Sequence, residues 1–131
     1  MIRFALPILI LGACAANAAL PQKTSNSDEA RITKALAGLS PGQPQECIDR
    51  NRVGETRGFR DTILYVGGKG KVWRNDTVGS CSGLAHDDLL VVKSMGSRLC
   101  RGDQVTTHAR LGGMLTSACA LGPFVPYTKA K

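Results

Sequence analysis

Four cysteines, Cys47, Cys81, Cys100 and Cys119, constrain the fold of this chain more than any other feature. An even number of cysteines in a small exported domain predicts two disulfides. A zinc site is the alternative, but paired zinc ligands usually lie about two to four residues apart. The spacings here, from 47 to 81, 81 to 100 and 100 to 119, are far longer. We therefore expect disulfides, with no metal and no cofactor; spacing alone does not choose among the three pairings.

The expectation of export comes from residues 1–18, which have the pattern of a secretory signal peptide. Arg3 precedes an apolar run, and small residues follow it. Leu11-Gly12-Ala13-Cys14 resembles a bacterial lipobox, in which Cys14 is lipidated and the signal is residues 1–13. Ala16-Asn17-Ala18 resembles the site of the ordinary signal peptidase, and this alternative stays open. Either route exports the protein, to the periplasm or to an outer membrane that holds its lipid anchor.

The remaining chain has the length of one domain, with a polar tether at 19–27 and the domain at 28–128. A helix is predicted over 28–39, because Asn26 or Ser27 can cap it and apolar residues recur at helical spacing. That stripe consists of Ile32, Ala35, Leu36 and Leu39.

From Cys47 onward the pattern is that of strands and turns. Residues 62–66 and 71–75 are rich in strand-forming residues and flank a glycine-rich turn at 67–70, which predicts a hairpin. Further strands are expected at 47–48, near Phe59, and at 89–93, 104–108 and 114–116. The fold class expected is mainly β: a small antiparallel β-barrel or sandwich with one N-terminal α-helix, stapled by two disulfides.

Several short motifs, spread along the chain, together resemble those of a known family. They are Cys47-Ile48-Asp49, Trp73-Arg74-Asn75, Cys81-Ser82-Gly83-Leu84, Leu99-Cys100-x-Gly102-Asp103 and Cys119-x-Leu121-Gly122-x-Phe124-x-Pro126-Tyr127. From about Asp28 to Thr128 the chain resembles a family of uncharacterised exported proteins of Gram-negative bacteria. The family has no assigned activity, so no site is carried over. Some of its members keep only the cysteines matching Cys47 and Cys100, and the resemblance thus implies Cys47–Cys100 and Cys81–Cys119.

The chain is basic, with a formal net charge of +7. Arg50, Arg52, Arg57 and Arg60 lie close together in the sequence, and they form a candidate patch for an anionic surface. Nucleic acid is not expected as a partner, because export separates the protein from the nucleic acids of the cell. Proteins that bind single strands also stack the bases on aromatic side chains, and only 5% of this chain is aromatic. An anionic lipid surface or an unknown envelope protein is the expected partner, with membrane contact only through a lipid anchor.

We interpret four other motifs as ordinary turns or loops without a functional role. Arg101-Gly102-Asp103 matches an integrin-binding tripeptide but predicts a turn, and Gly67-Gly68-Lys69-Gly70 lacks the order of a phosphate-binding loop. His86-Asp87-Asp88 predicts a polar loop before the strand at 89–93 rather than an acid–base pair. Asn75-Asp76-Thr77 fits a glycosylation sequon, but in a bacterial protein we interpret it as a turn.

With no catalytic constellation in the sequence, we expect an exported, non-enzymatic binding or structural module of the cell envelope. An inhibitor of a periplasmic hydrolase is the alternative, since small disulfide-bridged domains suit that role. A third hypothesis is a hydrolase that uses His86 or His108.

Overall fold

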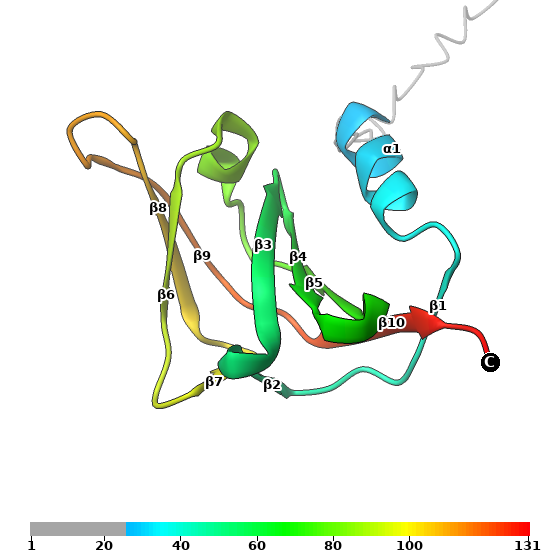
Figure 1. Ribbon diagram of the computed structural model, residues 1–131. Helices are drawn as coiled ribbons and strands as arrows, with labels where there is room; N and C mark the ends of the chain where they lie inside the picture. The colour runs from blue at the N-terminus through cyan, green and yellow to red at the C-terminus, as the bar shows by residue number, and fades with distance from the viewer. Residues whose placement is uncertain (1–25) are drawn as a thin grey trace, which may run out of the picture.

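The computed structural model describes residues 26–131, in which one α-helix is followed by ten short strands (Figure 1). The helix α1 spans Asn26–Ala35, and three 3₁₀ helices are η1 (Arg50–Arg52), η2 (Gly68–Gly70) and η3 (Ser82–His86). The strands are β1 (Leu39–Pro41), β2 (Cys47–Asp49), β3 (Val53–Phe59), β4 (Thr62–Gly67), β5 (Val72–Asp76), β6 (Leu89–Lys93), β7 (Arg98–Cys100), β8 (Gln104–His108), β9 (Leu115–Ala120) and β10 (Phe124–Lys129).

All paired strands are antiparallel, and they form three sheets. The largest sheet has the order β1-β10-β5-β4-β3, a second has the order β6-β8-β9, and β2 pairs with β7. The predicted hairpin is confirmed, because β4 and β5 pair from Thr62↔Asp76 to Val66↔Val72 around the glycine-rich turn. The expectation of a mainly β fold with one helix is likewise confirmed.

The two larger sheets do not close into a barrel, so the barrel, one of the two expected arrangements, is wrong. Closure would require β3 to pair with β6, but each is the terminal strand of its own sheet. The chain between β5 and β6 includes η3, which contacts β3, β8 and β9 (Figure 1). Leu84 of η3 packs so closely on Gly58 of β3 that a methyl group there would lie 2.9 Å from Leu84 Cδ2. Thus η3 occupies the end of the space where the two strands would meet.

The largest sheet is covered on both faces, because strand β4 is buried on both sides. Ile63 and Tyr65 belong to the main hydrophobic cluster between the sheets. Leu64 belongs to a second cluster, in which Ile32 and Leu36 of the helical segment cover the other face. The layers are therefore helix, five-stranded sheet and three-stranded sheet, and β4 has the continuous apolar sequence that a fully covered strand requires.

The helix is shorter than predicted. It ends at Ala35, and after Gly38, which has a positive φ of 77°, Leu39 begins strand β1 and pairs with Lys129 of β10. Ile32 and Leu36 are buried, and Leu39 packs on the same cluster from its strand. The apolar stripe thus marks the buried side correctly, but it does not mark the end of the helix.

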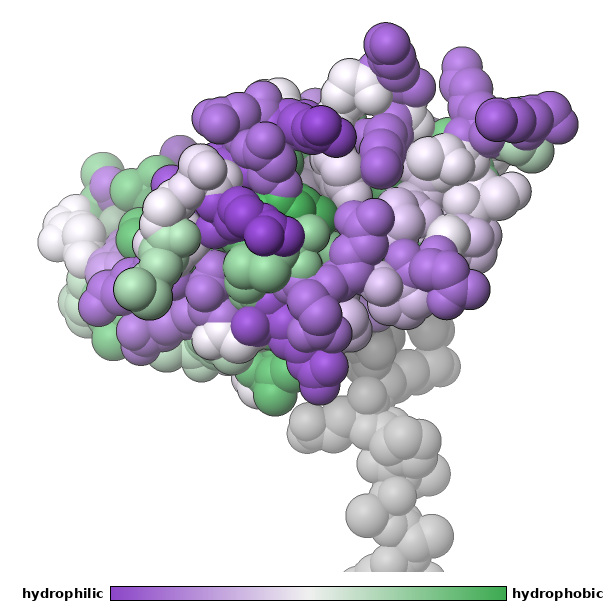
Figure 2. Space-filling model, turned by 90° about the horizontal axis from the view of Figure 1, so that it is seen from below, coloured by the Kyte–Doolittle hydropathy of each residue, from purple (hydrophilic) through white to green (hydrophobic). Residues whose placement is uncertain are grey.

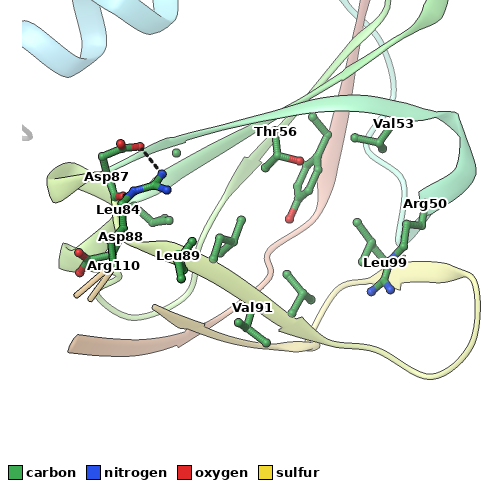
Figure 3. A pocket seen from close by; sticks show the side chains of 14 residues that line it. Arg50, Val53, Thr56, Leu84, Asp87, Asp88, Leu89, Val91, Leu99 and Arg110 are labelled. Carbon is green, nitrogen blue, oxygen red and sulfur yellow. Dashed lines mark hydrogen bonds and ion pairs between the residues drawn. The ribbon is translucent and has the colours of Figure 1, made fainter. Parts of the chain in front are cut away.

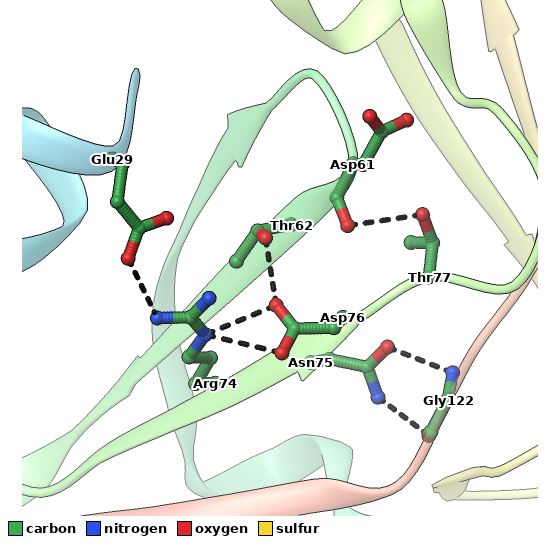
Figure 4. A network of polar contacts seen from close by, with 8 residues as sticks. All are labelled: Glu29, Asp61, Thr62, Arg74, Asn75, Asp76, Thr77 and Gly122. Carbon is green, nitrogen blue, oxygen red and sulfur yellow. Dashed lines mark hydrogen bonds and ion pairs between the residues drawn. The ribbon is translucent and has the colours of Figure 1, made fainter. Parts of the chain in front are cut away.

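Polar contacts join the helix to the largest sheet, and β5 to the segment that precedes β10 (Figure 4). Arg74 of β5 pairs with Glu29 of α1 at 3.3 Å. The buried side-chain amide of Asn75 donates to the Gly122 carbonyl at 2.7 Å and accepts from the Gly122 N–H at 2.9 Å. Gly122 precedes β10, and a β-carbon there would collide with the Asp76 carbonyl oxygen. Asn75 and Asp76 lie in strand β5, which corrects the interpretation of Asn75-Asp76-Thr77 as a turn.

Candidate functional site

A cleft lies between strands β3 and β6 and has a volume of about 610 Å³ (Figure 3). In the part of the chain that the structure describes, no backbone hydrogen bond links these two strands, so the cleft follows two unpaired sheet edges. On the face seen from below, apolar side chains lie in a hollow between polar ones (Figure 2). We call this feature the β3–β6 cleft. Its volume falls within the range of about 300–1,000 Å³ that ligand pockets occupy.

Strand β6 presents its backbone edge, and not only one face, to the cleft. Four successive residues, 89–92, line it. Side chains of successive strand residues point to opposite faces, so a row of four lining residues means that the strand borders the cleft along its edge. Leu90 and Val92 pack against the main hydrophobic cluster, whereas Leu89 and Val91 are 45% and 44% exposed.

The opposite side of the cleft comes from β3 and its neighbours. Val53, Thr56 and Gly58 line it from β3, and Leu84 and Leu99 complete the apolar wall from η3 and β7. Leu84 and Leu99 are buried members of the main cluster, which fixes their positions. A ligand in the cleft would therefore lie against a rigid apolar wall.

Tyr65 of β4 lines the cleft, and its buried hydroxyl has no hydrogen-bond partner among the described residues. The residue is 2% exposed and lines the cleft, and its ring packs at 5.7 Å from that of Phe124. No hydrogen-bond partner for Tyr65 Oη is found among the described residues. Burial raises the pKa of this hydroxyl far above its ordinary value, so it stays protonated and is a hydrogen-bond donor. Because an unpaired buried donor costs about 1–3 kcal/mol, this hydroxyl favours an acceptor in the cleft.

The end of the cleft next to Lys93 is positively charged. Arg50 of η1 lines it, and its Nη2 donates to Ser94 Oγ at 2.7 Å. Ser94 directly follows β6, so this bond places Arg50 beside the end of that strand. Arg50 makes no ion pair with a carboxylate in the described residues.

The other end of the cleft carries carboxylates (Figure 3). Arg110 Nη2 lies 3.2 Å from Asp87 Oδ1, and Arg110 Nε donates to the Asp87 carbonyl. Asp88, which directly precedes β6, accepts a hydrogen bond from Thr116 Oγ1 at 2.6 Å and has no ion-pair partner in the described part of the chain. At one end of β6 Arg50 thus makes no ion pair, and at the other end Asp88 makes none, whereas Arg110 pairs with Asp87.

The structure spreads the four predicted patch arginines along β3. Arg50 and Arg52 lie in η1 before the strand, whereas Arg60 lies in the turn after it. Arg57 binds Glu55 through two hydrogen bonds of 2.8 and 3.1 Å, and this bonding lowers the pKa of Glu55. The structure therefore brings Arg50 and Arg52 together, separates Arg60 from them and neutralises Arg57. That these residues meet an anionic surface stays a prediction.

Both disulfides implied by the resemblance are present, and each ties down an element, β7 or η3, that lines the cleft. Cys47 and Cys100 are directly opposite each other on β2 and β7, with Cα atoms 4.0 Å apart. Cys81 and Cys119 join the start of η3 to β9, with a Cα separation of 5.5 Å. Cys14, the predicted lipidation site, lies outside the described residues.

Of the other motifs, the interpretation of Asn75-Asp76-Thr77 as a turn is wrong, whereas the contacts of Arg101-Gly102-Asp103 and of His108 are local. Arg101 pairs with Glu46 at 3.5 Å, and Asp103 Oδ2 accepts from the Cys100 N–H at 2.8 Å, so the tripeptide belongs to a turn. Both ring nitrogens of His108 are hydrogen-bonded, to the Gly113 carbonyl and to Thr106 Oγ1. Within residues 26–131, no cluster of three or more His, Cys, Asp or Glu side chains suits a metal ion.

Sequence reasoning missed the role of Tyr65 and the two edges. Tyr65 lies in a run of strand-forming residues, which only predicts burial. Whether its hydroxyl has a partner depends on β6 and η3, which lie far along the chain. The polar sequence of β3, in contrast, is a signal that could have indicated an edge strand.

Within the described part of the chain, no helix combines the length and apolar character needed to cross a membrane. Comparison with protein-family models, curated proteins and solved structures finds no match for the chain.

Proposed function

We propose that this protein is an exported, non-enzymatic binding module of the cell envelope, and that its ligand occupies the β3–β6 cleft. The observation that carries the proposal is Tyr65, a residue that lines the cleft and whose buried hydroxyl has no hydrogen-bond partner among the described residues. Rigid apolar walls and charged ends are typical of a binding site. The open, sandwich-like arrangement of the two larger sheets leaves this site accessible.

Export is supported by the two disulfides, because such bonds form and persist in oxidising compartments. The signal-peptide pattern and the resemblance to exported bacterial proteins support it too. A lipid on Cys14 would tie the protein to the membrane. Replacement of Cys14 with serine should then release the protein from membranes, whereas a mature chain that begins at Ala19 would exclude lipidation.

Site-specific photo-crosslinking in intact cells tests whether the cleft is occupied. A photoreactive amino acid is placed at Thr56 or Val91, on opposite sides of the cleft, and at Val78 as a control. Val78 is 62% exposed and does not line the cleft. We expect the same crosslinked product from Thr56 and Val91 and none from Val78. Equal products at all three positions, or none at the cleft, would refute the proposal.

The hairpin between β8 and β9 favours a second candidate, an inhibitor of a periplasmic hydrolase. Leu111 and Met114 at its tip are 92% and 72% exposed, and such an apolar loop could enter the active site of an enzyme. A crosslinker at Leu111 that captures a hydrolase, with no capture at Val91, would favour this candidate. Loss of inhibition on replacing both tip residues with serine would support it further.

A further inference from the structure

We propose that the β3–β6 cleft binds an extended polypeptide segment of a partner, which pairs antiparallel with β6 and places an acidic residue at Arg50 and a basic residue at Asp88. This inference rests on the proposed function and specifies its ligand. In this mode of recognition, main-chain hydrogen bonds to a free sheet edge hold the added strand, and side-chain contacts select its sequence.

The edge of β6 is suited to strand addition. It is regular, because all five residues pair with β8 without a bulge. It is also apolar from Leu89 to Val92, with one charged residue, Lys93, at its end. Proteins usually protect such edges with bulges or charges. A free, apolar and regular edge that lines a cleft therefore indicates a strand-shaped partner.

The edge of β3 is less suited to pairing. A bulge interrupts its register between Val53 and Glu55, and the Glu55–Arg57 ion pair lies on the strand. These features are typical of an edge that is protected against strand addition. We therefore assign the main-chain pairing to β6 and only side-chain contacts to β3.

Tyr65 requires an acceptor, and an added strand supplies one. The residue is 2% exposed, and its protonated hydroxyl has no hydrogen-bond partner among the described residues. Main-chain carbonyls recur along any extended segment, so one can meet this donor whatever the side chains of the partner. A purely apolar ligand would leave the donor unpaired, at a cost of about 1–3 kcal/mol.

The two ends of β6 set the order of charges along an antiparallel segment. Arg50 lies beside Ser94, at the carboxyl end of β6, and Asp88 lies at its amino end. Neither makes an ion pair in residues 26–131. An antiparallel partner runs from Arg50 to Asp88, so its acidic residue comes first and its basic residue last.

Two blocked pentapeptides of identical composition test the inference: acetyl-Glu-Val-Thr-Val-Lys-amide and the reversed-charge acetyl-Lys-Val-Thr-Val-Glu-amide. Each is titrated to millimolar concentration into isotope-labelled protein while amide resonances are followed by NMR. We expect the first peptide to shift the amides of β6, and the reversed peptide to bind about tenfold more weakly, because two ion pairs become two repulsions.

Three variants sharpen the test. Arg50→Glu should lower or reverse the preference for the first peptide, whereas Arg60→Glu, the same change in the turn beyond β3, should leave it unchanged. Tyr65→Phe should weaken binding about threefold to tenfold, as expected for a lost hydrogen bond. The spread of the amide resonances shows whether each variant is folded, so a lost fold is not mistaken for lost binding.

The inference is overturned if both peptides bind equally, if neither shifts β6, or if hexanoate, a small carboxylate, reproduces the same shifts. It is also overturned if β6 shifts with protein concentration alone, because a second copy of the chain is then the occupant. Crosslinking from the cleft in cells together with failure of the peptides would refute only the ligand assignment. Failure of the crosslinking as well would refute the proposed function.

Discussion

The side-chain amide of Asn75 in β5 forms the hydrogen bonds that a neighbouring strand would otherwise offer to Gly122, just before β10. This amide is fully buried and forms two hydrogen bonds with Gly122. Asn75→Ala would leave the buried Gly122 N–H and carbonyl without partners. We expect the free energy of unfolding to fall by about 2–4 kcal/mol, measured by urea denaturation. Asn51→Ala, at an exposed position, should change it by less than about 0.5 kcal/mol; equal effects would contradict this account.

Tyr65 makes stability depend on pH in the alkaline range. Burial raises the pKa of its hydroxyl in the folded protein, whereas an unfolded tyrosine ionises near pH 10. The folded state therefore keeps a proton that the unfolded state loses above pH 10, and stability falls as the pH rises. Above pH 10, we expect the free energy of unfolding of the wild type to fall by up to about 1.4 kcal/mol more per pH unit than that of Tyr65→Phe. The free energies of unfolding are measured by urea denaturation at each pH. If those of the two proteins fall equally with pH, the hydroxyl is not buried.

Among the elements, helix α1 is held by apolar contacts more than by its ion pair. Ile32 is 1% exposed in the second hydrophobic cluster, whereas the Glu29 side chain that pairs with Arg74 is 51% exposed. We expect Ile32→Ala to lower the free energy of unfolding by about 2–4 kcal/mol, and Glu29→Gln by less than about 1 kcal/mol. Denaturant unfolding measures both, and a larger loss for Glu29→Gln would contradict this ranking.

The elements that could be predicted from the sequence are those with a strong local pattern. The hairpin of β4 and β5 has runs of strand-forming residues around glycines, and the first turns of α1 have an apolar stripe. Strand β3 was predicted only near Phe59, because its other residues, 53–58, are mostly polar and an edge strand needs few apolar contacts. Strand β10 was missed because Pro126 cannot donate to a neighbouring strand, although its carbonyl accepts from the Gly42 N–H.

The fold of the whole molecule depends on which distant segments meet. The disulfide pairing is implied by a resemblance and not by spacing, and the contact between Leu84 and Gly58 joins segments that lie far apart in the sequence. The sequence indicates Arg50, but as part of a patch for an anionic surface. Its place at one end of β6 follows only from the tertiary structure.

The Cys81–Cys119 disulfide joins η3 to the smaller sheet, and η3 closes one end of the cleft. Replacing both cysteines with alanine should lower the free energy of unfolding by about 2–5 kcal/mol. Hydrogen exchange should increase most in η3 and β9, whereas the β4–β5 hairpin should keep its protection. Uniform loss of protection would indicate that the disulfide has no local role. A free thiol in the oxidised wild type would contradict the pairing itself.

The central claim is that the β3–β6 cleft is kept open for a ligand. Its most direct test compares two properties of Tyr65→Phe: the stability of the purified protein at pH 7, and the crosslinking yield from Val91 in cells. Removing a hydroxyl that has no partner should leave the free energy of unfolding unchanged or higher, while the crosslinking yield falls. A variant that loses stability but keeps its crosslinking yield would show that the hydroxyl serves the fold, and it would contradict the claim.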